Sequence, residues 1–239
     1  MTDDRSPRDI RVLEDPAAEA AEWLVAAAQS GAHIALSGGS TPRAAYERAA
    51  ALGADWSRAT LWFGDERCVP PEHEHSNYGM AKRALLDRIE GEQPAVRRIA
   101  GELGFAAAAD AYERELRGVF GEEEVPVLDW VLMGLGPDAH TASLFPNDPA
   151  LGERERAAVG VETPGMPPLV SRVTLTLPVV NAAREVVFLV AGEDKAEAVA
   201  RAFGDAPGPD APASLVDPDG GSLVLLLDPA AASRLEASR

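Results

Sequence analysis

The chain has 239 residues, 46% of them hydrophobic, a formal net charge of −17 and one cysteine, which is the composition of a soluble globular protein with a sizeable core. The acidity argues against a nucleic-acid partner, because backbone binding needs clustered Lys and Arg, and the apolar runs are too short to span a membrane. The lone Cys68 excludes an internal disulfide and a thiolate metal cluster. Since the polar N-terminus lacks the order of a secretory signal, we expect a cytoplasmic protein.

Apolar, strand-like runs alternate with helical patterns along the whole chain. We expect strands at 33–37, 60–64, 129–134, 173–177, 186–190 and 223–227, and helices at about 16–30, 42–52, 76–89, 105–120 and 193–203. Several strands are continuously apolar, as in sheets covered on both faces. The pattern predicts an α/β fold: one domain, 1–239, with a doubly wound, mostly parallel sheet and helices on both faces, a Rossmann-like three-layer sandwich. Ligands of such sheets bind beyond the carboxyl ends of strands.

The stretch "SGGSTP", Ser37 to Pro42, follows the first of these strands and precedes a helix. Gly38 and Gly39 permit a tight turn, and the hydroxyls of Ser40 and Thr41 can donate hydrogen bonds. Backbone N–H groups at a helix N-terminus favour an anion such as phosphate. The alternative is an ordinary cap, in which Ser40 or Thr41 bonds its own first turn. The spacing matches neither the Walker loop nor a dinucleotide fingerprint.

The next strand ends in "GDERCVP", Gly64 to Pro70. Three consecutive ionisable residues here form either a solvated loop or the rim of a cleft to which Asp65 and Arg67 contribute. Cys68 is interpreted as structural, because a catalytic thiol needs a nearby histidine and a lowered pKa. The following "SNYGMAKRALL" begins a helix, and capping accounts for Asn77, with a substrate contact as the alternative.

Four histidines are available to catalysis or metal binding. His73 and His75 lie two residues apart with no further histidine at ligand spacing, so we expect no metal. His33 opens an apolar strand and is expected to be structural. His140 lies in "GLGPDAHTASLFP" directly after the strand at 129–134, where substrates bind, and an unperturbed imidazole is suited to take a proton near neutral pH. Asp138 either orients His140 or caps the turn.

Two later cations lie beside predicted strands: Arg172 directly before the strand at 173–177, and Lys195 after the strand at 186–190. Arg172 in "SRVTLTLPVVNAA" can pair bidentately with a phosphate, although an arginine at a strand start is more often a surface residue. Lys195 in "AGEDKAEAV" begins a helix, where a cation is mildly disfavoured unless an anionic ligand is present.

In this order the segments resemble the 6-phosphogluconolactonase family of the pentose phosphate pathway, from "LSGGSTP" and "WFGDERCVP" through "SNYGMAKRALL" and "GLGPDAHTASLFP" to "VVFLVAGEDKAEAV". The family shares its doubly wound fold with glucosamine-6-phosphate deaminases. Those enzymes typically continue after the histidine with "IAFNEP", whereas "TASLFP" follows here without an acid. Both relatives usually place Gly before the histidine, where this chain has Ala139, and a positive φ there would strain the alanine.

The resemblance implies that His140 is the general base for water attack on 6-phospho-D-glucono-1,5-lactone, with Asp65 at the reacting end and no cofactor. It implies a binding surface made of Gly38, Gly39, Ser40, Thr41, Arg67, Asn77, Arg172 and Lys195. The resemblance also implies a small-molecule substrate, and a functional link between this protein and glucose-6-phosphate dehydrogenase. The alternatives are a deaminase/isomerase of the sibling family and a non-catalytic sugar-phosphate sensor, although no DNA-binding module accompanies this domain.

Overall fold

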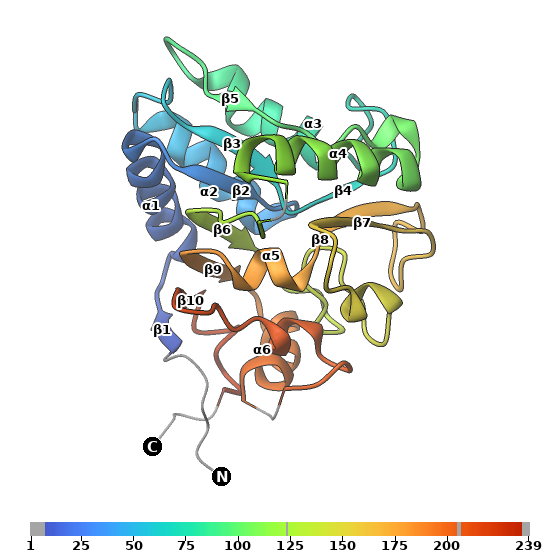
Figure 1. The fold of residues 1–239 in the computed structure, drawn as a ribbon. Coiled ribbons are helices and arrows are strands. Elements are labelled where there is room, and N and C mark those ends of the chain that lie inside the picture. The colour runs from blue at the N-terminus through green and yellow to red at the C-terminus, as the bar shows by residue number, and fades with distance from the viewer. Residues whose placement is uncertain (1–7, 123, 205–206, 236–239) are drawn as a thin grey trace.

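A seven-stranded, all-parallel sheet forms the centre of the molecule (Figure 1). The computed structural model describes residues 8–122, 124–204 and 207–235. The strand order is β1-β10-β9-β6-β2-β3-β5, which confirms the predicted doubly wound α/β class. The strands are β1 (Arg8–Val12), β2 (His33–Leu36), β3 (Thr60–Phe63), β5 (Ala95–Val96), β6 (Trp130–Met133), β9 (Glu185–Val190) and β10 (Ser222–Leu227).

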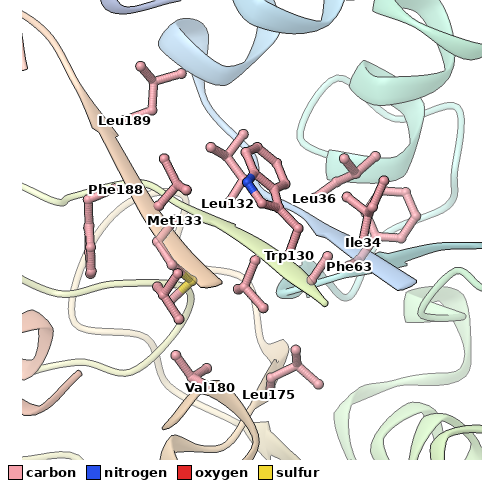
Figure 2. Close-up of a cluster of buried hydrophobic side chains, with 14 of the residues drawn as sticks. Ile34, Leu36, Phe63, Trp130, Leu132, Met133, Leu175, Val180, Phe188 and Leu189 are labelled. Carbon is pink, nitrogen blue, oxygen red and sulfur yellow. The ribbon is translucent and has the colours of Figure 1, made fainter. Parts of the chain in front are cut away.

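The central strands are apolar because both faces of the sheet are covered. All four residues of β6 are buried, and in β9 and β10 only the first residue is not. Figure 2 shows the resulting core, in which side chains from neighbouring strands β2, β6 and β9 gather together, among them Ile34, Leu132 and Phe188. Burial of such side chains stabilises the fold by about 1.5–3 kcal/mol each.

Helices flank this sheet on both faces. In Figure 1, α4 and α5 pass in front of the sheet, and α2 lies behind it. The helices are α1 (Pro16–Ser30), α2 (Ser40–Ala51), α3 (Asn77–Ala84), α4 (Phe105–Phe120), α5 (Leu177–Asn181) and α6 (Ala196–Phe203), with short 3₁₀ turns at Leu86–Arg88, Gly101–Leu103, Pro149–Gly152, Glu193–Lys195 and Pro212–Leu215. Among the described residues no helix is long and apolar enough to cross a membrane.

A second, three-stranded antiparallel sheet was not expected from the sequence. It contains β4 (Asp65–Arg67), β8 (Arg172–Leu175) and β7 (Ala158–Val161), so the strand predicted at 173–177 exists but lies outside the parallel sheet. Gly64 joins the two sheets: its N–H donates to Leu36 O of β2 at 2.9 Å, and its carbonyl accepts from Leu175 N of β8 at 2.8 Å.

The direction of chain winding reverses between β2 and β6. From β2 the chain adds β3 and β5 on one side, and from β6 it adds β9 and β10 on the other. Loops leaving neighbouring strands at such a switch point diverge and leave a crevice at the carboxyl end of the sheet. The stretch after β2 is "SGGSTP" and the stretch after β6 is "GLGPDAHT". The fold therefore brings the two most informative motifs of the sequence together.

Candidate active site

A cavity of about 260 Å³ opens at this switch point. Its wall combines the two loops with the small antiparallel sheet and the segment after β9. The sequence-predicted site residues that line it are Gly38, Gly39, Ser40, Thr41, Asp65, Arg67, His140, Arg172 and Lys195. Asn77 is not part of this wall. Residues separated by more than 150 positions in the chain thus share one pocket.

The Ser37–Thr41 loop presents an uncapped helix end to the cavity. Helix α2 begins at Ser40 after Gly39, whose φ of 109° requires glycine, and no side chain caps it. The alternative in which Ser40 or Thr41 caps the helix is therefore wrong in this structure. The first backbone N–H groups and the positive end of the helix dipole are available to an anion. Gly38 is also required, because a Cβ there would lie 2.0 Å from the Asn77 side-chain oxygen.

A tight turn after β6 carries His140. The Gly136 N–H donates to His140 O at 2.8 Å, and the Gly136 carbonyl accepts from Ala139 N at 3.0 Å. The His140 ring lies directly over Gly136, where a Cβ would approach Nδ1 to 2.0 Å. On another side it packs against Phe145, with ring centroids 4.5 Å apart. The ring is therefore held by its own turn, with 16% of its side chain exposed.

Asp138 and His140 form a hydrogen-bonded pair, with Asp138 Oδ1 2.5 Å from His140 Nδ1. Burial alone acts to raise the pKa of Asp138, but the hydrogen bond to the ring and the charge of His140 outweigh it, so the pKa is lowered. An ionised carboxylate can only accept, so Nδ1 carries the proton and Nε2 is the proton acceptor of the neutral ring. Asp138 therefore orients the His140 ring. Its Oδ1 also accepts from His140 N at 3.2 Å, so it braces the turn as well.

Ala139 has a positive φ of 65° and is fully buried. Alanine is strained at this positive φ, which lowers the stability of the fold by about 1–2 kcal/mol relative to glycine. The residue nevertheless keeps its backbone contacts: Ala139 N donates to Gly136, and Ala139 O accepts from Ala213 N at 3.0 Å. The turn and the Asp138–His140 pair both form with alanine in place.

Asp65 is a buried carboxylate at the start of β4, only 4% exposed. Its Oδ1 accepts from Asn77 Nδ2 at 2.9 Å, and its Oδ2 accepts from Ser143 Oγ at 2.6 Å. Asn77 Nδ2 also donates to the Asp65 backbone carbonyl at 2.9 Å. Asn77 thus lies behind the cavity wall, between Asp65 and Gly38, at the first residue of α3.

Arg67 and Arg172 face each other across the antiparallel pair β4–β8, where they are in register. Arg172 is 2% exposed, and its Nη2 donates to the carbonyls of Met166 and Pro168 at 3.0 and 3.2 Å. Burial lowers the pKa of Arg172, an effect that Arg67 reinforces and Asp65 opposes. The Nε atoms of both arginines are buried and have no hydrogen-bond partner among the described residues. Each arginine thus keeps one unpaired donor buried behind the cavity wall that its residue lines.

Lys195 adds a third cation from the opposite side. It ends the 3₁₀ turn after β9 and immediately precedes α6. Within the described part of the chain, no carboxylate forms an ion pair with it. The cavity is therefore cationic around an uncapped helix end, although the whole chain has a formal net charge of −17.

Sequence reasoning overlooked three contributors to this site. Ser143 contacts Asp65, Gly136 makes room for the His140 ring, and Met166 lines the cavity from the loop held by Arg172. Ser143 and Gly136 both lie within the quoted "GLGPDAHTASLFP" stretch, three residues after and four residues before His140. This closeness in sequence was the one indication that they belong to the site. Met166 lies in a loop without any motif.

The other polar residues singled out by the sequence lie outside the cavity wall. His33 Nδ1 accepts from the Trp62 indole at 3.1 Å in an aromatic cluster. Burial raises the pKa of the Cys68 thiol, which disfavours the reactive thiolate. The rings of His73 and His75 lie 5.1 Å apart, and the described residues contain no group of three candidate metal ligands.

Comparisons with known proteins show the family of the chain. The family model described as glucosamine-6-phosphate isomerases/6-phosphogluconolactonase matches residues 10–225. The human protein named 6-phosphogluconolactonase is 42% identical over 224 residues, which cover 91% of this chain and 86% of that protein. The one from Nostoc sp. is 42% identical over 208 residues, 84% of either chain. The solved structure of 6-phosphogluconolactonase from Trypanosoma cruzi is 30% identical with a TM-score of 0.82, covering 98% of this chain and 100% of that one. The chain therefore belongs to the glucosamine-6-phosphate isomerase/6-phosphogluconolactonase family.

Proposed function

We propose that this chain hydrolyses 6-phospho-D-glucono-1,5-lactone to 6-phospho-D-gluconate in the oxidative pentose phosphate pathway, with His140 as the general base. The names of relatives that match most of the chain support the reaction. The observation that carries the mechanism is that His140, paired with Asp138, and the uncapped end of α2 line one cavity.

The phosphate of the substrate binds at the N-terminus of α2. The backbone N–H groups and the hydroxyls of Ser40 and Thr41 donate to its oxygens, and Lys195 supplies a positive charge from the opposite wall. Binding at this remote group orients the lactone, so that the energy of phosphate recognition serves the chemical step. Arg67 and Arg172, which also line the cavity, supply two further positive charges near the substrate.

His140 carries out the proton transfers. Nε2 accepts a proton from water as the water oxygen forms a bond to C1, which gives a tetrahedral oxyanion. The bond between C1 and the ring oxygen then breaks, and the imidazolium returns its proton to the departing oxygen, leaving a C5 hydroxyl and a C1 carboxyl. Asp138 keeps Nδ1–H in place and stabilises the transient imidazolium.

Asp65 lies at the reacting end of the cavity in this scheme. Both of its oxygens already accept a hydrogen bond, but a carboxylate oxygen can accept more than one, so a substrate hydroxyl can bind there. We assign Asp65 to this anchoring contact. Asn77 supports it from behind the wall, and direct contact between Asn77 and the substrate stays a prediction.

The proposed substrate also implies a functional partner. Oxidation of C1 of glucose 6-phosphate by its dehydrogenase forms the lactone, so this chain acts directly after that enzyme. The link is one of shared metabolite, and physical contact is not required for it.

The decisive experiment is lactone hydrolysis with His140→Asn. The lactone is generated with glucose-6-phosphate dehydrogenase, and the product is detected with 6-phosphogluconate dehydrogenase, against a control without enzyme because the lactone also opens spontaneously. We expect His140→Asn to lower kcat by about 10²–10⁴-fold, the usual contribution of a positioned base. The matched control is His73→Asn, an exposed histidine outside the cavity, with wild-type turnover.

Two results would contradict the proposal. Near wild-type kcat in His140→Asn would remove His140 as the base. Ammonia release from glucosamine 6-phosphate without lactone hydrolysis would favour the sibling activity instead.

A further inference from the structure

Ser143 connects the turn of the base to the carboxylate on the other side of the site. It is fully buried, and its hydroxyl donates to Asp65 Oδ2 at 2.6 Å although the two residues are 78 positions apart. Ser143 itself does not line the cavity. It can therefore influence a substrate only through the residues that it contacts.

The surroundings of Ser143 fix its position. Its backbone N–H donates to Thr174 Oγ1 at 3.2 Å, and Thr174 is the β8 residue in register with Asp65. Between His140 and Ser143 the chain turns sharply, with Ala142 at a φ of 48° and a bridge between Thr141 and Leu144. The turn that carries His140 is thus attached to β4 and β8 at one point.

The carboxylate of Asp65 has little freedom while Ser143 is present. Asn77 holds Oδ1 and Ser143 holds Oδ2, so the plane of the carboxylate is defined by donors on both sides. The positive charge of Arg172 acts on Asp65 as well. Without the Ser143 hydroxyl, Oδ2 loses its donor, and the carboxylate is held only by Asn77 while the charge of Arg172 still attracts it.

We propose that Ser143 is a positioning residue that sets the orientation of Asp65 relative to His140 and thereby the rate of lactone opening. The inference rests on the proposed function. It separates two parts of the site: phosphate recognition by α2 and Lys195 does not pass through Ser143, whereas alignment of the reacting end does. Loss of the hydroxyl should therefore lower kcat and leave KM nearly unchanged.

The test is Ser143→Ala with steady-state kinetics on the lactone, corrected for spontaneous opening. We expect kcat to fall about 10- to 100-fold, since a displacement of about 1 Å at a reacting centre can lower the rate by about 10², and KM to change by less than about 3-fold. The matched control is Ser214→Ala, another buried hydroxyl, which accepts from Gly208 N at 3.0 Å away from the cavity. It should keep wild-type kcat and KM. Circular dichroism verifies that each variant is folded.

A double-mutant cycle adds a readout that a purely structural role would not produce. If Ser143 acts through Asp65, then Ser143→Ala introduced into Asp65→Ala should lower kcat by less than about 2-fold further. Multiplicative effects of the two substitutions would overturn the inference, as would an unchanged kcat or a rise in KM alone for Ser143→Ala. Absence of hydrolysis in the wild-type chain would instead refute the proposed function, so the two failures are distinguishable.

Discussion

Replacing Gly136 with alanine should displace His140, the proposed base, while leaving the fold in place. Gly136 does not have a positive φ, so its backbone tolerates an L-residue, and the effect comes from the added methyl group alone. The new Cβ would lie 2.0 Å from His140 Nδ1 and 2.2 Å from Cε1, and 2.8 Å from Asp138 Oδ1. The ring must move by about 1.4 Å to reach an ordinary contact of 3.4 Å. Phe145 packs on the ring at 4.5 Å and restricts where it can go.

The magnitude follows from that displacement. A misplacement of about 1 Å can lower the rate by about 10²-fold, and loss of the Asp138 contact removes part of the contribution of the base, about 10²–10⁴-fold in total. We therefore expect kcat to fall by at least about 10²-fold in the coupled lactone assay. Overpacking should lower the free energy of unfolding by about 1–3 kcal/mol, which corresponds to a few degrees to about 12 °C in Tm.

Gly118→Ala is the matched control for this substitution. Gly118 lies within α4, and a Cβ there meets no atom within 4 Å. Alanine should raise the free energy of unfolding by about 0.5–1 kcal/mol and leave kcat unchanged, because glycine is the poorer residue inside a helix. Wild-type kcat in folded Gly136→Ala would refute the steric reasoning and with it the placement of the His140 ring.

Three further substitutions test other parts of the site. Asp138→Asn should lower kcat by about 10²-fold or more with little change in KM, because an amide no longer enforces the Nδ1–H tautomer; an unchanged kcat would contradict this. Lys195→Met should lower kcat/KM about 10- to 100-fold, mainly through KM, as expected for a lost charged contact, whereas Lys82→Met on the surface should not. Burial raises the pKa of Glu66 despite four donors, so its contribution to stability is complete below its ordinary pKa of about 4.3 and declines as pH rises through the raised value. In urea unfolding, wild type should therefore lose stability relative to Glu66→Gln as pH rises above about 4.5; a difference independent of pH would be inconsistent with this.

The fold was predictable where burial leaves a strong pattern in the sequence. Strands β2, β3, β6, β9 and β10 are continuous apolar runs, and α4 was predicted with its observed bounds, Phe105–Phe120. Two missed strands lack that pattern: β4 is "DER", and β1, "RDIRV", is an edge strand with charges. The other two, β5 and β7, are apolar but have only two and four residues. Polar strands form because their partners and the tertiary context favour them, which propensity cannot reveal. For the same reason β8 was recognised as a strand but assigned to the wrong sheet.

The sequence predicted which residues line the cavity better than it predicted which of them contact one another. Motifs after β2 and β6 identified the Gly38–Thr41 loop and His140 as parts of one cavity, since strand ends at a switch point meet. The bond between Ser143 and Asp65 depends on a register between distant segments, which sequence alone does not specify. The Arg67–Arg172 pairing has the same origin, because β4 and β8 become neighbours only in the second sheet.

At Gly64 the chain passes from the parallel sheet into the small antiparallel sheet, and this connection affects the order in which the two sheets fold. The parallel sheet is built around β2, β3 and β6, and its pairings do not require β8. Asp65 acquires Ser143 as a partner only after β4 has met the His140 turn, 78 positions away in the chain, and contacts of long sequence separation form slowly. During refolding, recovery of helical circular dichroism should precede recovery of hydrolysis. Enzymatic activity thus reports the completion of the small sheet, a late event that spectroscopic probes of the helices do not detect.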